Sequence, residues 1–233
     1  MTAPITAMEL DALLLSLKVG LVCTVASLPL GIAMGWLLAR RQFAGKAVVE
    51  GLVQLPLVLP PVVTGYLLLV LFGRQGLIGR WLTEHLGVSF AFDWRGAALA
   101  SAIVGFPLMV RAIRLAFDAV DPALEQASLT LGRGRWQTFL RISLPLALPG
   151  VLTGALLCFA RSLGEFGATI VFAGNIEGVT RTLPLAIYTA IQTPEGEAAA
   201  LRLVMLAVVV SFAAVLTSEW LSRRTSMRRS PTA

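Results

Sequence analysis

Long apolar stretches separated by short charged connections dominate the pattern along this chain. A helix of about 20 apolar residues suffices to cross a bilayer. Five stretches are predicted to do so, at residues 12–39, 48–73, 96–117, 142–170 and 200–222. A sixth run, 182–191, is too short to cross and is expected to lie at, or dip into, one membrane face. The pattern predicts an all-α, polytopic membrane protein with a single transmembrane domain over 1–233.

Composition agrees with a lipid environment. The 233 residues are 57% hydrophobic and 14% charged, with a mean hydropathy of +0.81, whereas a soluble domain carries about 25% charged residues. Glu9 and Asp11 precede the first apolar stretch, and Arg40 and Arg41 follow it. A cleaved signal peptide has the opposite order of charges, so this stretch is expected to remain as an anchor.

The positive charges predict the orientation in the membrane. Twelve of the 19 Lys and Arg residues fall on one side of the predicted spans. These twelve are Arg40, Arg41, Lys46, Arg111, Arg114, Arg133, Arg135, Arg141, Arg223, Arg224, Arg228 and Arg229. Basic residues concentrate on the cytoplasmic side of membrane proteins, so the N-terminus is predicted outside and the C-terminus inside. The net charge of +6 is thereby assigned to topology, and no nucleic-acid partner is expected.

The chain offers little for catalysis. It has one histidine, His85, in a connecting segment, and two cysteines, Cys23 and Cys158, in apolar runs where they are expected to be small buried residues. Gly45-Lys46 is not a phosphate-binding loop, because the required earlier glycine and following Ser or Thr are missing. No catalytic residue, metal site or cofactor is predicted, so active transport would draw its energy from another polypeptide.

The connection between the third and fourth spans is predicted to form a short capped helix at 122–131. Asp121 suits an N-cap, Pro122 the first helical position and Gly132 the helix end. Leu124, Ala127, Ser128 and Leu131 follow the i, i+3, i+4, i+7 spacing of one helix face. Two interpretations are open: a helix resting on lipid headgroups, or a helix that docks into a groove of another protein.

Gln126-Ala127-Ser128, Gly132 and, after nine residues, Ile142-Ser143-Leu144-Pro145 resemble the cytoplasmic EAA loop of binding-protein-dependent ABC importer permeases. Gln126 replaces the usual glutamate, and Glu125 stands one position earlier. In that family the loop is a coupling helix that seats in a cleft of the ATPase subunit. The resemblance implies this role for Leu124, Glu125, Gln126, Ala127, Ser128, Leu131 and Gly132.

The resemblance extends over nearly the whole chain. Residues 40–46, 54–61 and 159–168 are similar to molybdate and sulfate permeases, and 173–194 to the molybdate members. It implies a type I importer permease (MetI-like) in the bacterial inner membrane, acting as a homodimer with two copies of a separate ATP-binding subunit and an external oxyanion-binding protein. Molybdate is the expected substrate, with sulfate, thiosulfate or tungstate as alternatives.

Two groups of residues are candidates for lining the solute path. Pro60 and Pro61 interrupt the helical hydrogen-bond ladder of the second span near Thr64 and Gly65. Carbonyls freed in this way are tolerated where they are buried in protein or face water. The bend therefore either lines the path or is a packing kink without solute contact.

Arg161 and Glu165 form the second group, four residues apart on the predicted fourth span. An ionised group at mid-bilayer costs roughly 2.5–3.5 kcal/mol on insertion scales, and an i, i+4 ion pair lowers that cost. The pair either lies at the path or the dimer interface, where Arg161 attracts a dianion, or only orients the helix.

Two other classes of function fit less well. Five spans are few for a secondary transporter or channel built from inverted repeats, and no repeat is evident. An intramembrane enzyme would need paired catalytic groups at one depth.

Overall fold

The computed structural model describes residues 6–194 and 196–227, with side chains placed as far as Thr217. Its helices are α1 (Ala7–Arg40), α2 (Lys46–Val58), α3 (Pro61–Phe72), α4 (Leu77–Leu86), α5 (Trp94–Asp118), α6 (Pro122–Thr130), α7 (Arg135–Thr138), the π-helical turn η1 (Phe139–Ser143), α8 (Leu144–Leu163), α9 (Gly167–Phe172), α10 (Leu183–Gln192) and α11 (Glu197–Met227). The described residues contain no strand. The all-α fold is confirmed.

Four helical segments of the described chain are long and apolar enough to cross a membrane. They are α1, α5, the continuous run 135–163 and α11 as far as Thr217. A fifth crossing, expected at 48–73, is divided into α2 and α3, which meet at an angle of 112°. Leu59 is extended, with a ψ of 142°, because a residue that precedes proline avoids the helical region. The bend predicted at Pro60-Pro61 is therefore confirmed, as a full break.

The core lies where α1, α5 and α8 pack together. Small residues bring their backbones close: a Cβ added to Gly35 of α1 would lie 2.6 Å from Ile113 Cγ2, and one on Gly150 of α8 would lie 2.1 Å from Ala116 Cβ. Met109, Ile113 and Phe117 of α5 are fully buried between these helices. Glycine and alanine at helix contacts are typical of bundles packed inside membranes.

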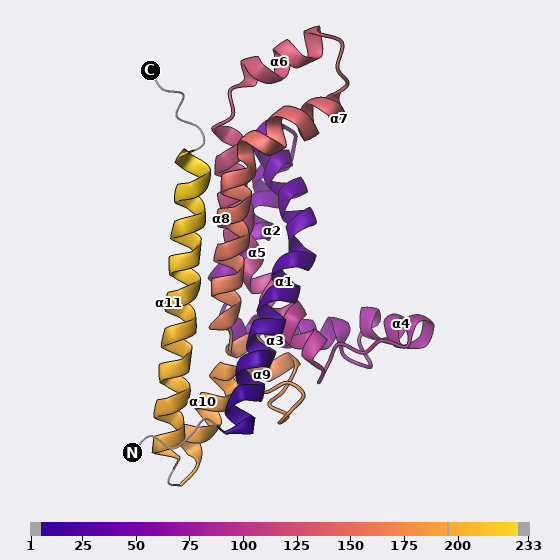
Figure 1. Cartoon of the computed structure of the whole chain (residues 1–233). Helices are drawn as coiled ribbons and strands as arrows, with labels where there is room; N and C mark the ends of the chain where they lie inside the picture. The colour runs from indigo at the N-terminus through magenta and orange to yellow at the C-terminus, as the bar shows by residue number, and fades with distance from the viewer. Residues whose placement is uncertain (1–5, 195, 228–233) are drawn as a thin grey trace.

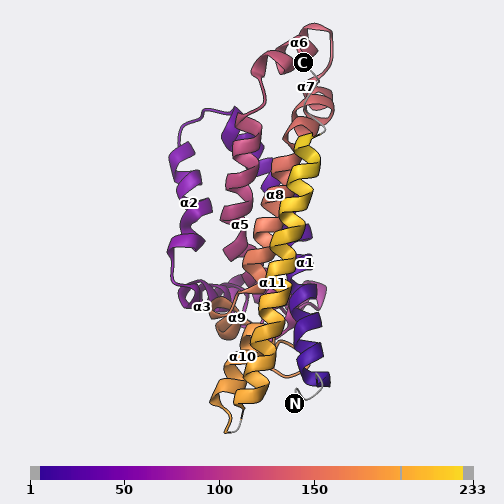
Figure 2. The same ribbon diagram turned by 60° about the vertical axis from the view of Figure 1, so that its left-hand side comes forward.

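The α2–α3 segment is held more loosely. No residue of α2 is buried, and Figure 2 shows this helix standing beside α5. An ion pair between Glu50 of α2 and Arg114 of α5 joins the two, with Oε1 and Nη1 2.9 Å apart. Below α2, α3 turns across the bundle and packs on α9.

The two ends of the bundle differ. At one end, called the α6 end below, lie α6, α7 and the last turns of α1 and α11; at the other, called the α10 end, lie α10 and the first turns of α1 and α11 (Figure 1). The connections predicted to be cytoplasmic therefore share one end. Arg228 and Arg229, which were counted with them, lie outside the described residues.

Helix α4 lies between residues 73 and 96, in a connection for which no secondary structure was predicted. One expected span also differs. The stretch 142–170 is not one helix, because α8 ends at Leu163 and α9 begins at Gly167. The short run at 182–191 does form a helix, α10.

Candidate coupling and pathway sites

Helix α6 begins and ends as the sequence predicts. The Asp121 carboxylate accepts a hydrogen bond from the Ala123 amide at 2.8 Å, and Pro122 takes the first helical position. After Leu131 the chain turns at Gly132, whose φ is +85° and whose amide donates to the Leu129 carbonyl at 3.0 Å. This left-handed conformation favours glycine.

The predicted apolar face of α6 divides in two. Leu124, Ala127 and Leu131 are exposed, Leu131 by 82% of its surface. Ser128 is buried instead, and its hydroxyl is hydrogen-bonded to that of Thr138 at 2.9 Å. The exposed part is a small apolar patch at the α6 end, while Ser128 fastens α6 to α7.

Glu125 lies half-buried at the junction of three elements. Its Oε1 accepts from Arg40 Nε at 3.1 Å and from the Ser143 hydroxyl at 2.8 Å. Arg40, the last residue of α1, also donates from Nη2 to the Val120 carbonyl at 2.7 Å. The side chains of Arg40 and Glu125 are only 14% and 21% exposed. Glu125 therefore holds α6 on α1 and η1, and Gln126 is left exposed.

Aromatic rings fix the segment that follows. Phe139 of η1 stacks on Trp136 and Phe117, at centroid distances of 5.4 and 6.0 Å, and meets Trp36 of α1 edge-on at 5.7 Å. These contacts attach the chain leaving α6 to both α1 and α5. The patch on α6 is thus carried on a braced support rather than on a free loop.

The proline bend lies against α9. A Cβ on Gly65 would lie 2.6 Å from the Ala168 carbonyl oxygen, and one on Gly167 would lie 2.8 Å from Pro61 Cβ. Thr64 is buried, and its hydroxyl has no hydrogen-bond partner among the described residues. Helices α3 and α9 therefore cross at backbone contact, next to an unpaired polar atom.

Arg161 and Glu165 pair as expected but do not share a helix face. Helix α8 ends at Leu163, so Glu165 lies in the connection to α9. Its Oε2 is 2.9 Å from Arg161 Nη1, and its Oε1 accepts from the Ala168 amide at 2.9 Å. The Glu165 side chain is 1% exposed and that of Arg161 29%. Glu165 is thus a buried anchor for the start of α9, and Arg161 keeps part of its surface free.

The pathway candidates consequently gather in one region, around the α3–α9 crossing at the end of α8. Pro60 and Pro61 start α3, Thr64 and Gly65 lie one turn further, and Glu165 contacts α9 directly. Cys23 and Cys158 are buried free thiols, as predicted.

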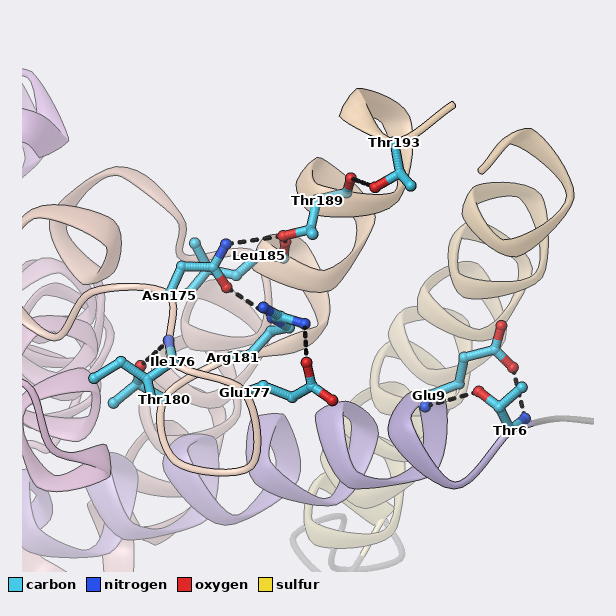
Figure 3. Close-up of polar contacts among 10 residues, drawn as sticks. All are labelled: Thr6, Glu9, Asn175, Ile176, Glu177, Thr180, Arg181, Leu185, Thr189 and Thr193. Atoms are coloured by element: carbon cyan, nitrogen blue, oxygen red, sulfur yellow. Dashed lines mark hydrogen bonds and ion pairs between the residues drawn. The ribbon is translucent and has the colours of Figure 1, made fainter. Parts of the chain in front are cut away.

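At the α10 end, a cavity of about 580 Å³ lies between α1, α10 and α11. Glu9 Oε1 accepts from Arg202 of α11 at 2.8 Å. Across the cavity, Arg181 donates to Asn175 and Glu177, both at 3.0 Å, and Asn175 donates to Thr189 of α10 (Figure 3). Both arginines are neutralised by carboxylates, so the cavity carries no free positive charge among its described lining residues. No local sequence pattern indicated that Arg40 pairs with Glu125 or that Arg202 pairs with Glu9.

These features define a helical membrane protein: membrane-length helices, a broken span, and an exposed apolar helix at one end. Residues 27–227 match the family described as binding-protein-dependent transport system inner membrane component, and the chain belongs to this family.

Relatives with known names agree with this assignment. The chain is 58% identical over 215 residues to the molybdenum transport system permease protein ModB of Escherichia coli (strain K12), covering 92% of this chain and 94% of that one. It is 56% identical over 217 residues to ModB of Haemophilus influenzae, covering 93% and 95%.

A solved structure of the MetNI methionine ABC transporter superimposes with a TM-score of 0.74 at 16% identity, covering 97% of this chain and 99% of that one. At that identity the likeness concerns the fold, which is that of ABC importer permeases.

Proposed function

We propose that this chain is the membrane-spanning permease subunit of an ATP-driven importer that carries molybdate into the cell. The observation that carries the proposal is the 58% identity to ModB, which extends over 92% of the chain. Identity at this level covers both the α6 end and the region of the α3–α9 crossing. Sulfate, thiosulfate and tungstate importers are the alternatives that the substrate test separates.

The patch on α6 is the proposed contact with a separate ATP-binding subunit. Leu124, Ala127 and Leu131 form an apolar surface suited to a groove, with Gln126 beside it. Glu125, Ser128 and Gly132 have an indirect role in this contact, because they hold α6 in place. The chain itself hydrolyses no ATP in this proposal and catalyses no other reaction.

The proposed assembly is a homodimer with two ATP-binding subunits and an external oxyanion-binding protein. The α6 end faces the cytoplasm, in accord with the twelve basic residues predicted on that side. The α10 end and the N-terminus face outward. In this orientation the external binding protein would approach the α10 end.

The α3–α9 crossing is the proposed place where solute passes. Arg161 is the candidate for transient contact with a dianion, because it keeps exposed surface beside its carboxylate partner. Glu165 repels an anion and is assigned a positioning role. Thr64, beside this crossing, has a buried hydroxyl without a partner among the described residues.

Uptake by the reconstituted complex tests the proposal. The permease, its ATP-binding subunit and its binding protein are placed in proteoliposomes, and uptake of radioactive molybdate is measured with and without enclosed ATP. Unlabelled tungstate, sulfate, thiosulfate and phosphate compete in parallel. ATP-dependent molybdate uptake that resists sulfate is expected. Sulfate uptake without molybdate uptake would reject the substrate, and uptake that ignores ATP would reject the importer.

A further inference from the structure

Helix α4 is amphipathic and extends away from the bundle, across the direction of the long helices (Figure 1). Its apolar residues share one half of the helix surface with His85, whose ring stacks on Trp81, while Arg80, Thr83 and Glu84 share the other half. The apolar residues are Leu77, Ile78, Trp81, Leu82 and Leu86. Arg80 and Glu84 pair with each other at 2.8 Å and are well exposed. One side of α4 is thus suited to water and the other to an apolar phase.

The ends of α4 are well defined. Gly79 packs so closely on the preceding turn that an added Cβ would lie 2.1 Å from the Gly73 carbonyl oxygen. At the other end Gly87 has a φ of +63°, and its amide donates to the Thr83 carbonyl at 3.2 Å. A tight entry and a glycine stop make α4 a distinct helix with a set direction.

The apolar side of α4 has little cover from the described part of the chain. Leu77 is 85% exposed, Trp81 53% and Leu86 60%. The Trp81 ring stacks on His85 of the same helix, with a centroid distance of 5.1 Å, rather than on another element. An exposed apolar surface of this kind marks an interaction site.

The start of α5 places α4 near a membrane boundary. Only seven residues separate Leu86 from Trp94, the first residue of α5. Lys18 Nζ lies 3.8 Å from the centre of the Trp94 ring, and tryptophan and lysine concentrate at the membrane–water boundary. Helix α5 has 25 residues, a length of about 37 Å that spans the roughly 30 Å hydrocarbon layer. Trp94 and the neighbouring α4 therefore belong at the level of the headgroups.

We propose that α4 is an interfacial helix whose apolar side lies in the outer leaflet of the bilayer. A helix that lies along the boundary inserts its apolar side among acyl chains and keeps its polar side in water. Arg74 and Arg95 stand at either end of the segment and suit lipid phosphates. The outer leaflet, rather than the inner, rests on the orientation given under the proposed function.

Lipid fits α4 better than a protein partner does. The apolar surface spans half of the helix circumference and is convex, which suits a soft planar boundary rather than a groove. The short turn from α3 means that this contact also sets where the proline-bent segment lies in the bilayer. A second copy of the chain, or the external binding protein, is the competing occupant that the test distinguishes.

Spin-label accessibility of the full complex in phosphatidylethanolamine–phosphatidylglycerol liposomes tests the proposal. Leu77→Cys and Trp81→Cys report the apolar side, and Thr83→Cys and Glu84→Cys the polar side, in a Cys23→Ala, Cys158→Ala background. Val209→Cys in the middle of α11 is the lipid reference, and Glu177→Cys the aqueous one.

The apolar-side labels are expected to collide severalfold more with oxygen, relative to a water-soluble nickel complex, than the polar-side labels do. Equal nickel access on both sides would place α4 in water and overturn the proposal. Low access to both reagents at Leu77 and Trp81 would show a protein cover and also overturn it. Molybdate uptake is measured on the same liposomes, so that a failure of the transport proposal is seen separately from the accessibility pattern.

Discussion

The two ends of α1 carry the same kind of bond and use it differently. Near the start, the Glu9 carboxylate, 6% exposed, accepts twice from Arg202 of α11, at 2.8 and 3.0 Å. At the end, Arg40 pairs with Glu125 of α6. The first pair closes two long helices over a cavity. The second holds a short helix whose apolar patch stays uncovered. One ion pair therefore joins two long helices, and the other holds a helix in place so that its apolar patch remains exposed.

The largest effect is expected when a charge is introduced into the exposed apolar patch of α6. Ala127→Glu should insert and fold normally but lose the ATP-binding subunit, because a carboxylate in an apolar groove costs several kcal/mol unless it is paired. About 1.4 kcal/mol already weakens an association tenfold. Pull-down of the ATP-binding subunit measures this. Gln126→Glu is the matched control and should bind normally, since the family motif carries glutamate there. If Ala127→Glu binds the ATP-binding subunit and takes up molybdate as the wild type does, α6 is instead a surface helix that rests on lipid.

Removing the bond behind the patch should have the next largest effect. Arg40→Gln leaves the half-buried Glu125 carboxylate without its charge partner, at a cost of roughly 1–3 kcal/mol, so ATP-driven uptake should fall about tenfold while the chain still inserts. The neighbouring Arg41→Gln serves as the control. Exchange of both residues, Arg40→Glu with Glu125→Arg, should restore part of the uptake; no recovery would mean that the Val120 contact of Arg40, and not the pair, matters.

The glycine turn after α6 offers a smaller and cleaner test. Gly132→Val forces a branched side chain into a φ of +85°, at a cost of about 1–3 kcal/mol, and should reduce coupling of ATP hydrolysis to uptake. Gly134 has a φ of −68° and open space around it, so Gly134→Val should couple normally. Equal effects of both valines would show that bulk near α6, rather than backbone conformation, is responsible.

At the α10 end the expected effect is on stability. Glu9→Gln should lower the unfolding midpoint of the purified protein by a few degrees, since charged hydrogen bonds contribute roughly 1.5–3 kcal/mol. Uptake per folded molecule should stay near normal. The exposed Asp11 supplies the control, Asp11→Asn. A loss of uptake without a loss of stability would make the α10 end part of the transport machinery.

The side of the membrane on which the α6 end and the α10 end lie can be measured without changing either set of contacts. In the cysteine-free background, Arg133→Cys should react with a membrane-impermeant maleimide only from the cytoplasmic side, and Glu177→Cys only from outside. The reverse labelling would invert the comparison, with α6 outside and the cavity inside.

Local rules predicted the features that depend on neighbouring residues. Asp121 and Pro122 set the start of α6 and Gly132 its end, through capping and backbone preference. Pro60-Pro61 break the second apolar stretch. Gly164 was not predicted to end α8, so Glu165 was expected inside a helix that ends two residues before it.

The features that depend on tertiary structure had no such signal. Arg40 and Glu125 are 85 positions apart, and Arg202 and Glu9 are 193 positions apart. Ser128 followed the apolar spacing of α6 but is buried against Thr138, because the neighbouring α7 covers that side. Helix α4 differs: Leu77, Ile78, Trp81 and Leu82 follow an amphipathic helical spacing, but the segment that contains His85 was treated only as a connection.

The length of α1 gives its two ion pairs a common mechanical meaning. Its 34 residues run without a break past Pro29, a rod of about 51 Å at 1.5 Å per residue. A tilt of only 5° would shift one end against the other by about 4 Å over this length. Arg40 is paired with Glu125 of α6, and Glu9 is paired with Arg202 of α11. A tilt of α1 driven by a partner at α6 would therefore change the shape of the cavity at the far end of the helix.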